Sequence, residues 1–275
     1  MRRRSFLLAC AAVAGARVAA AQDNSVQKGT WRIDERPDLQ NLFRDAGTQG
    51  TIVVRDVATR RVTVIDPARA RLPFLPASTF KIANALIALE TGVVADADNP
   101  IFPWDGKTRS IAAWNADHTL GSGFKVSSVP TFQEIARRIG PERMARFVKA
   151  LDYGNADIGG AAIDQFWLEG NLRISAEAQI GFLERLYREE LPVSKRTQAI
   201  VKDIMLLEGG EGAALRGKTG WATTHTPGIG WLVGWFERAS GPAFFALNLD
   251  MHEIGLAPVR LRIVKAVLRE LRIAR

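Results

Sequence analysis

Runs of β-branched and aromatic residues lie near both ends of the chain. Residues 51–57 and 61–65 are two such runs, and the three residues between them fit the turn of an antiparallel hairpin. Residues 213–219, 230–236 and 243–250 have the same character near the other end. We therefore expect one antiparallel sheet to which the N-terminal and the C-terminal parts of the chain both contribute strands.

The middle of the chain has hydrophobic positions at helical spacing, which Gly, Pro and Asn interrupt at short intervals. The helical segments that this spacing predicts are 131–139, 142–151 and 164–167, followed by 176–189, 194–207 and 259–271. The predicted fold class is α+β. An antiparallel sheet formed by the N- and C-terminal parts has flanking helices, and an all-helical region is inserted over about 76–175.

The first 21 residues have the order of a signal peptide. Residues 2–4 are arginines, an apolar stretch follows, and three alanines end the segment. We expect cleavage after Ala21, export to the periplasm and a single domain over 22–275. The second and third arginines, followed by Ser-Phe-Leu, are also similar to a twin-arginine export signal, so the twin-arginine and Sec routes both stay open.

The composition is that of a globular protein, since 47% of the 275 residues are hydrophobic and 24% are charged. The formal net charge is +8, but four of the 37 basic residues lie within residues 1–21, which leaves 33 basic against 29 acidic side chains, or +4. This is an ordinary surface charge, so we expect no nucleic-acid partner. No run of eighteen apolar residues is present, which argues against a membrane anchor.

Histidine and cysteine are too sparse to suggest a metal site. The three histidines, His118, His225 and His252, are far apart, and the only cysteine, Cys10, lies in the signal peptide. Neither set has the spacing of a metal-binding motif. We therefore expect no metal and no disulfide in the processed chain.

Candidate chemistry begins in the segment Pro-Ala-Ser-Thr-Phe-Lys that starts at Pro76. Lys81 is the only charged residue between Pro73 and Leu89, so we expect it in a buried helix. Helical spacing places Ser78 one turn away, about 5–6 Å between Cβ atoms, within reach of the lysine nitrogen. Burial lowers the pKa of a lysine toward the neutral amine, which can act as a base or react with carbon dioxide. A helix cap formed by Ser78 is the alternative, but it leaves a cation in the first turn unexplained.

Two further motifs lie downstream. The first, Ser127-x-Val129, precedes a proline at the start of a helical stretch, where a hydroxyl could pass a proton to a leaving group. The second, Lys218-Thr219-Gly220, ends a predicted strand. Its lysine and hydroxyl can bind a carboxylate, and its glycine lets a substrate lie close to the backbone. Each motif is a weak indication when taken alone.

In this order the motifs resemble those of the penicillin-recognising serine acyltransferases, and the chain is similar to a class D, oxacillinase-type β-lactamase. The class D character comes from Ser127-x-Val129, where class A enzymes have Ser-Asp-Asn. Tyr153 in a Tyr-Gly-Asn turn and the Gln-Phe-Trp-Leu-Glu-Gly segment at 165–170 add to it. The resemblance covers about residues 28–272.

The resemblance implies a catalytic role for each matching residue. Ser78 would be acylated by the lactam carbonyl. Lys81, carboxylated on its amine by carbon dioxide or bicarbonate, would be the general base, and no other cofactor is implied. Trp167 would donate its indole N–H to the carbamate, Val129 would help to exclude water, and Ser127 would pass a proton to the lactam nitrogen.

Substrate binding is implied in the same way. The backbone N–H groups of Ser78 and Trp221 would form the oxyanion hole. The residues that would bind the substrate, and above all its carboxylate, are Lys218, Thr219, Gly220 and Arg260. Arg260 is aligned only by its distance from apolar residues of the last helix, so Arg262 is an alternative.

The implied activity is hydrolysis of β-lactam antibiotics such as penicillins and oxacillin by a monomer or homodimer, with antibiotic resistance as the result. A penicillin-binding D,D-peptidase or transpeptidase and a β-lactam sensor domain would use the same serine and lysine, and they are the alternatives. Residues 212–219 also match the P-loop pattern. No helix is predicted directly after them, as a P-loop requires, so we do not expect a nucleotide site.

Overall fold

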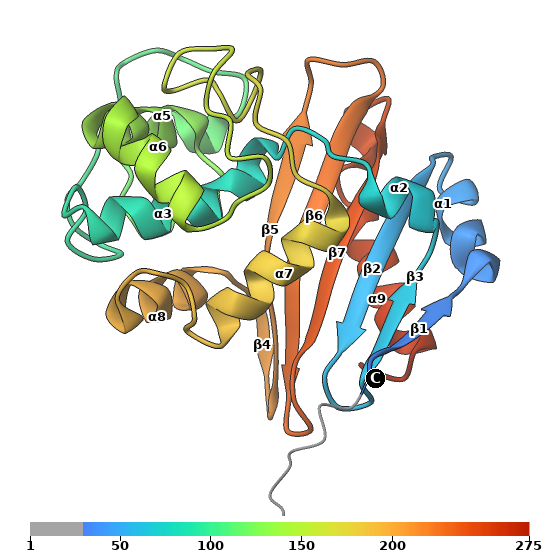
Figure 1. Cartoon of the computed structure of the whole chain (residues 1–275). Coiled ribbons are helices and arrows are strands. Elements are labelled where there is room, and N and C mark those ends of the chain that lie inside the picture. Colours follow the sequence, from blue (N-terminus) through green and yellow to red (C-terminus); the bar gives the residue numbers. More distant parts are fainter. Residues whose placement is uncertain (1–29, 275) are drawn as a thin grey trace, which may run out of the picture. The chain divides into compact units, whose positions relative to one another are not determined.

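A seven-stranded sheet lies at the centre of the structure, a computed structural model that describes residues 30–274. In spatial order the strands are β1 (Arg32–Glu35), β3 (Arg61–Val64), β2 (Gly50–Asp56), β7 (Ala243–Met251), β6 (Gly228–Arg238), β5 (Ala213–Ala222) and β4 (Leu206–Gly210). β2 pairs with β7, so strands from the two ends of the chain meet in the middle of the sheet (Figure 1). The sheet predicted from both ends of the chain is confirmed.

The two edge strands differ from the sequence-based expectation. β1 pairs in parallel with β3, which makes the sheet mixed, and three of its four residues are exposed. β4 is exposed along its whole length and replaces the end of the helix predicted at 194–207. An edge strand that buries so little lacks the alternation of buried and exposed positions that indicates a strand in a sequence.

Helices cover both faces of the sheet (Figure 1). The helices and 3-10 turns are η1 (Pro37–Gln40), α1 (Asn41–Arg44), α2 (Pro67–Arg71), η2 (Ala77–Phe80), α3 (Lys81–Glu90), η3 (Ala112–Trp114), α4 (Leu120–Lys125), α5 (Val129–Ile139), α6 (Pro141–Ala150), α7 (Ala176–Tyr187), α8 (Lys195–Ile204), η4 (Ile254–Leu256) and α9 (Val259–Glu270). α9 packs on β6 and β7 from one side, and α7 crosses β2, β6 and β7 on the other. The predicted α+β fold class, with an inserted helical region, is confirmed.

One predicted helix is wrong. Residues 164–167 form a series of turns, closed by backbone hydrogen bonds such as the one from Gly170 N–H to the Phe166 carbonyl. Phe166 and Trp167 are adjacent, and both are fully buried. Consecutive side chains point about 100° apart on a helix, so a short surface helix would expose one of these two rings.

α3 is the buried centre of the helical region. Each of its residues from Lys81 to Leu89 is buried. The turn η2, which precedes α3, packs against β5. The helical region and the sheet therefore meet at the start of α3, close to the residues that the sequence analysis selected.

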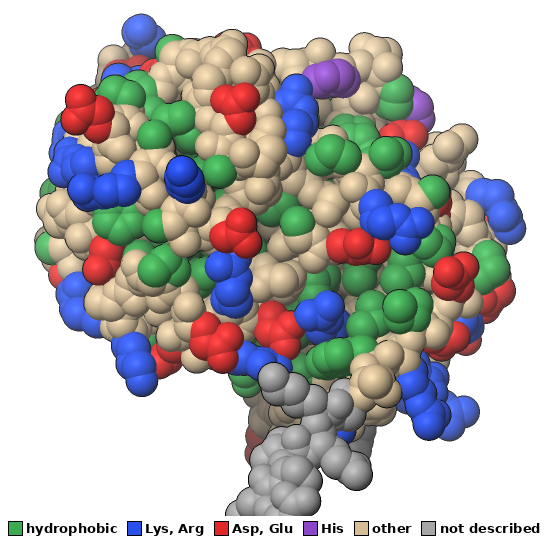
Figure 2. Space-filling model, in the orientation of Figure 1, with side chains coloured by type: hydrophobic (Ala, Val, Ile, Leu, Met, Phe, Trp, Pro, Cys, Tyr) green, Lys and Arg blue, Asp and Glu red, His purple; other side chains and the backbone are tan. Residues whose placement is uncertain are grey.

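Charged side chains of both signs are interspersed over the face of the molecule shown in Figure 2. Charged side chains of the described residues form ion pairs, for example Lys265 with Glu208 and Arg216 with Glu237. Among residues 30–274, no helix is long and apolar enough to cross a membrane. The signal peptide predicted at 1–21 lies outside the described residues.

Candidate active site

Ser78 and Lys81 lie where η2 runs into α3. Side chains three residues apart are eclipsed in a 3-10 turn, which brings these two together. Lys81 Nζ donates a hydrogen bond to Ser78 Oγ over 2.7 Å. Ser78 is half-buried, whereas Lys81 is fully buried. The structure thus places a hydroxyl that can be reached from outside against an amine that cannot.

The surroundings of Lys81 disfavour its charged form. Burial lowers the pKa of Lys81 well below its ordinary value, and the nearby Lys218 cation lowers it further. Ser78 is the one hydrogen-bond partner of Nζ among the described residues, and the Phe132 ring lies 5.3 Å away. A neutral amine in contact with a hydroxyl can accept its proton, so this pair has the arrangement of a nucleophile and its base.

The Ser78 turn is held from two sides. The Ala77 N–H donates to the Trp167 carbonyl over 3.0 Å, and Ala77 has a positive φ of 46°, which is strained for alanine. Gly220 on β5 approaches from the other side. A Cβ atom at Gly220 would lie 2.9 Å from the Pro76 carbonyl oxygen. Glycine at this position is therefore required for the close packing of β5 against the turn.

Lys218 and Ser127 form a second polar pair of the site. Lys218 Nζ donates to Ser127 Oγ over 2.9 Å and to the Thr219 carbonyl over 3.0 Å, with the Thr219 hydroxyl 3.4 Å away. Ser127 lies between α4 and α5 with a φ of 56°, so its backbone conformation is also strained. Burial, and secondly the Arg260 cation, lower the pKa of Lys218 to about 7.

Arg260 lies next to the Lys218 strand, and Arg262 does not. Arg260 is 8% exposed, and its Nη1 donates to the Gly220 carbonyl over 2.6 Å. Burial lowers its pKa to about 10. Arg262 is exposed on the same helix. Of the two arginines that the sequence left open, Arg260 is the one that the structure brings to β5.

The remaining predicted residues occupy neighbouring positions. Val129 is the first residue of α5 and is half-buried. Trp167 is fully buried and stacks on Phe80 with ring centroids 5.6 Å apart. The indole nitrogens of Trp167 and Trp221 are both buried without a hydrogen-bond partner among the described residues. Buried N–H groups without a partner are rare in proteins, so the Trp167 N–H is a candidate to bind a group other than these residues.

Three buried polar residues that the sequence analysis did not assign to the site lie behind the Ser78 turn. They are Thr79, Tyr153 and Gln179. Tyr153 belongs to the Tyr-Gly-Asn turn that added to the class D resemblance. Thr79, in an apolar run, and Gln179, on the buried face of a helix, were signalled only as exceptions to the hydrophobic pattern. Their contacts depend on residues far apart in the chain, which spacing could not show.

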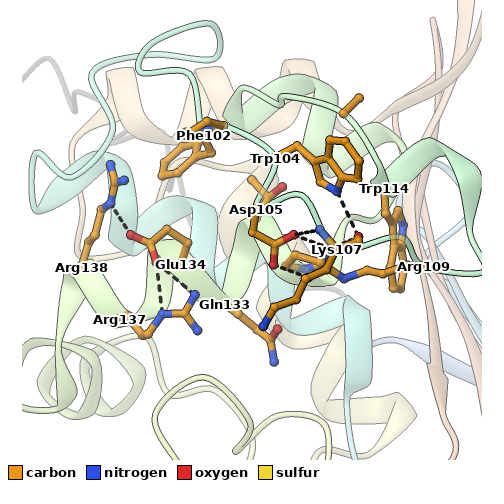
Figure 3. Close-up of a pocket in the computed structure, with 14 residues that line it drawn as sticks. Phe102, Trp104, Asp105, Lys107, Arg109, Trp114, Gln133, Glu134, Arg137 and Arg138 are labelled. Atoms are coloured by element: carbon orange, nitrogen blue, oxygen red, sulfur yellow. Dashed lines mark hydrogen bonds and ion pairs between the residues drawn. The ribbon is translucent and has the colours of Figure 1, made fainter.

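A cavity of about 360 Å³ lies beside α5 (Figure 3). None of the predicted site residues described above lines this cavity. Its wall combines aromatic rings, including Trp104 and Trp114, with charged side chains that are largely paired with one another. Arg109 pairs with Asp105 at 2.6 Å, and Arg138 with Glu134 at 2.8 Å. The indole of Trp114 donates to the Val126 carbonyl, which ties this wall to the segment that carries Ser127.

Two other sequence patterns can now be located. Residues 213–219 of the P-loop match lie in strand β5 (Ala213–Ala222), which is followed by strand β6 and not by a helix. The described residues contain no group of three or more His, Cys, Asp or Glu side chains that could hold a metal ion.

The chain is similar in sequence to proteins of a known family. Residues 50–271 match the sequence model of the penicillin binding protein transpeptidase domain. The chain is 47% identical to β-lactamase OXA-48 of Klebsiella pneumoniae over 228 residues, 83% of this chain and 85% of that protein. It is 42% identical to β-lactamase OXA-10 of Pseudomonas aeruginosa over 231 residues, 83% of this chain and 86% of that protein.

Solved structures are similar over nearly the whole described chain. The class D β-lactamase YbXI from Nostoc superposes with a TM-score of 0.83 at 44% identity, covering 86% of this chain and 99% of that one. FUS-1 (OXA-85), a class D β-lactamase from Fusobacterium nucleatum subsp. polymorphum, superposes with a TM-score of 0.84 at 39% identity, covering 88% and 100%. The sequence and the fold thus lead to the same group of proteins.

The contact between β5 and Arg260 predicts how Lys218 titrates. Its Nζ signal, followed by nitrogen-15 NMR in degassed buffer, should have a midpoint at a pH of about 7. The Arg260 cation disfavours the protonated amine of Lys218. Arg260→Met removes this cation, so the midpoint should rise. Arg262→Met, which removes an exposed charge from the same helix, serves as the control and should leave it unchanged. Equal midpoints in both variants would contradict the placement of Arg260.

Proposed function

The chain belongs to the class D β-lactamase family, and we propose that it hydrolyses β-lactam antibiotics through an acyl-enzyme on Ser78. The observation that carries this proposal is the 2.7 Å contact between Ser78 Oγ and the fully buried amine of Lys81. A serine hydroxyl is a weak nucleophile unless a base accepts its proton. The buried amine supplies that base directly beside the hydroxyl.

Acylation uses the Ser78 and Lys81 pair first and the Ser127 and Lys218 pair second. Ser78 Oγ attacks the lactam carbonyl carbon as the hydroxyl proton passes to the side chain of Lys81. The backbone N–H groups of Ser78 and Trp221 stabilise the oxyanion. When the lactam C–N bond breaks, Ser127 gives its proton to the leaving nitrogen, and Lys218, 2.9 Å from its oxygen, stabilises the charge that develops on Ser127.

The carboxylate of the substrate would bind on β5. Lys218 and Arg260 are buried cations, and neither forms an ion pair with a described residue. A buried charge without a partner is unfavourable, so an anionic ligand between them would gain from both. Thr219 adds a hydroxyl donor. The missing side chain at Gly220 faces the Ser78 turn and not the substrate, so it lets β5 bring these groups close to Ser78.

Two features of the chain fit a carbamate on Lys81. The lowered pKa of Lys81 favours the neutral amine with which carbon dioxide reacts. The unpartnered indole N–H of Trp167 supplies a buried donor that could hold the carbamate, together with the Ser78 hydroxyl. Bound there, carbon dioxide would supply an anionic base in place of a cation. Val129, at the start of α5, would help to keep bulk water from this part of the site.

The proposed acyl-enzyme is tested by removing Ser78 Oγ, the oxygen that would carry the acyl group. Ser78→Ala should lower kcat for penicillin hydrolysis by roughly 10⁴-fold or more and abolish covalent labelling by a fluorescent penicillin. The thermal midpoint should hardly change, because the substitution removes one half-buried atom. Expression of the unmodified chain in a susceptible bacterium should raise the inhibitory concentration of penicillin, and Ser78→Ala should not. Labelling of Ser78 without turnover would instead indicate a transpeptidase or a β-lactam sensor.

Trp167→Phe tests the carbamate, since it keeps a buried ring and removes the N–H donor. Deacylation should slow more than acylation, because the attacking water needs the base throughout the second step, and an acyl-enzyme should accumulate in mass spectra. Carbon-13 NMR with labelled bicarbonate should show one carbamate signal in the unmodified chain, a weaker one in Trp167→Phe and none in Lys81→Ala. Trp31→Phe, at the far edge of the sheet, is the matched control. Full activity in degassed, bicarbonate-free buffer with no carbamate signal would show that Lys81 acts as a free amine.

Export to the periplasm follows from the N-terminal sequence and belongs to the same proposal. The protein recovered from the periplasm of an expressing bacterium should begin at Gln22 when its intact mass is measured. A mass that retains residues 1–21 would contradict cleavage after Ala21. Replacing both Arg3 and Arg4 by lysine should block export if the twin-arginine route is used and leave it intact if the Sec route is used.

A further inference from the structure

A chain of buried hydrogen bonds links α7 to the turn that carries Ser78. Gln179 Nε2 donates to Thr79 Oγ1 over 3.0 Å, and Thr79 Oγ1 donates to the Pro76 carbonyl over 2.8 Å. Pro76 and Thr79 flank Ser78 in the sequence. Gln179 and Thr79 are both fully buried. The side chain of a distant helix thus reaches both ends of the nucleophile turn through one hydroxyl group.

The stability of the fold does not explain why an amide occupies this position. Gln179 Oε1 is buried without a hydrogen-bond partner among the described residues. Burying a polar atom without a partner destabilises the folded state. The other contact of the amide, from Nε2 to the Tyr153 hydroxyl, is long at 3.4 Å. An apolar side chain of the same size would lose the bond to Thr79 but would also remove the unpaired oxygen, so the two effects on stability oppose each other.

The turn that Gln179 contacts is one that the local sequence does not favour. Ala77 has a φ of 46°, a conformation that alanine adopts only when its surroundings impose it. The Pro76 carbonyl accepts both the Thr79 N–H, at 3.1 Å, and the Thr79 hydroxyl. Thr79 also packs against β5, since a Cβ atom at Gly220 would lie 3.1 Å from its Cγ2. Thr79 therefore fixes the turn relative to the strand that binds the substrate.

We propose that Gln179 is a positioning residue for the acylation step, acting through the Thr79 hydroxyl to hold the Ser78 turn in its strained conformation. This inference rests on the proposed role of Ser78 as the nucleophile. Gln179 touches neither the substrate nor the reacting atoms. Its hydrogen bond orients the Thr79 hydroxyl toward the Pro76 carbonyl, which keeps Ser78 Oγ against Lys81 and the Ser78 N–H in the oxyanion hole.

The loss of this hydrogen bond should change the rate of acylation and leave substrate binding unchanged. The groups that bind the carboxylate lie on β5 and α9 and have no hydrogen bond to Gln179. Small errors in the orientation of a nucleophile lower the rate of attack much more than they lower affinity. A residue with only a packing role would instead lower stability and leave the acylation rate of the folded protein unchanged.

Gln179→Met is the first variant, because methionine has a similar length and carries no donor and no unpaired oxygen. Stopped-flow acylation by a chromogenic cephalosporin should be slower by about tenfold or more, with the dissociation constant of the non-covalent complex unchanged. The thermal midpoint should change little, because the lost hydrogen bond and the removed unpaired oxygen have opposite effects on stability. Gln198→Met, which replaces a fully buried glutamine on α8 that bonds only to backbone groups of residues 191 and 193, is the matched control and should acylate at the normal rate.

Thr79→Val tests the same path if Gln179→Met fails to fold. Valine keeps the shape of threonine and removes the hydroxyl, so acylation should slow by a similar factor, and Thr79→Ser, which keeps the hydroxyl, should restore most of the rate. The double variant should be no slower than the slower single variant, since both substitutions break one path. Multiplied effects in the double variant would contradict a shared path.

The two proposals fail in different ways in this experiment. If the unmodified chain is not labelled at Ser78, the proposed function is wrong. If Ser78 is labelled normally and Gln179→Met or Thr79→Val acylates at the same rate as the unmodified chain, only the positioning role is overturned. A lower thermal midpoint with an unchanged acylation rate would show that Gln179 serves packing alone.

Discussion

The exclusion of water from one lysine amine is the constraint on which the active site depends. Lys81 is fully buried, and burial together with the nearby Lys218 cation lowers its pKa well below the ordinary value, which favours the neutral amine. α3 provides these surroundings because each of its residues through Leu89 is buried. A helix that looks like ordinary core packing therefore also serves the proposed chemistry, since water or an acidic side chain beside the amine would raise the pKa of Lys81 toward its ordinary value.

Three buried cations lie in the site, and no acidic residue of the described chain neutralises them. Lys81, Lys218 and Arg260 are all buried, and none of them forms an ion pair within residues 30–274. Their mutual repulsion lowers the pKa values of Lys81 and Lys218 beyond the effect of burial alone. An arrangement of this kind is stabilised by anions, so a substrate carboxylate or a carbamate on Lys81 would complete the electrostatics that the chain itself leaves incomplete.

Sequence patterns predicted those parts of the molecule that depend on local periodicity or on short motifs. The hairpin of β2 and β3, the late strands and α9 follow from hydrophobic spacing, and the Ser78 and Lys81 contact follows from a separation of three residues. Their contact comes from an eclipsed 3-10 turn, however, and not from the α-helix that spacing alone suggested. Edge strands with few buried residues and the irregular segment around Trp167 were missed, because their conformation is set by contacts with distant parts of the chain.

Some of the strained and unpaired groups of the described chain lie around Ser78. Ala77 and Ser127 have positive φ angles, and Trp167 Nε1 and Gln179 Oε1 are buried without partners among the described residues. Each such feature costs on the order of 1–3 kcal/mol, which the burial of two large hydrophobic clusters around the sheet can offset. The turn therefore does not hold its geometry by its own local preference. Its shape is imposed by β5, by the Trp167 segment and by α7. On the proposed mechanism, residues that never touch the substrate would therefore affect how fast Ser78 reacts.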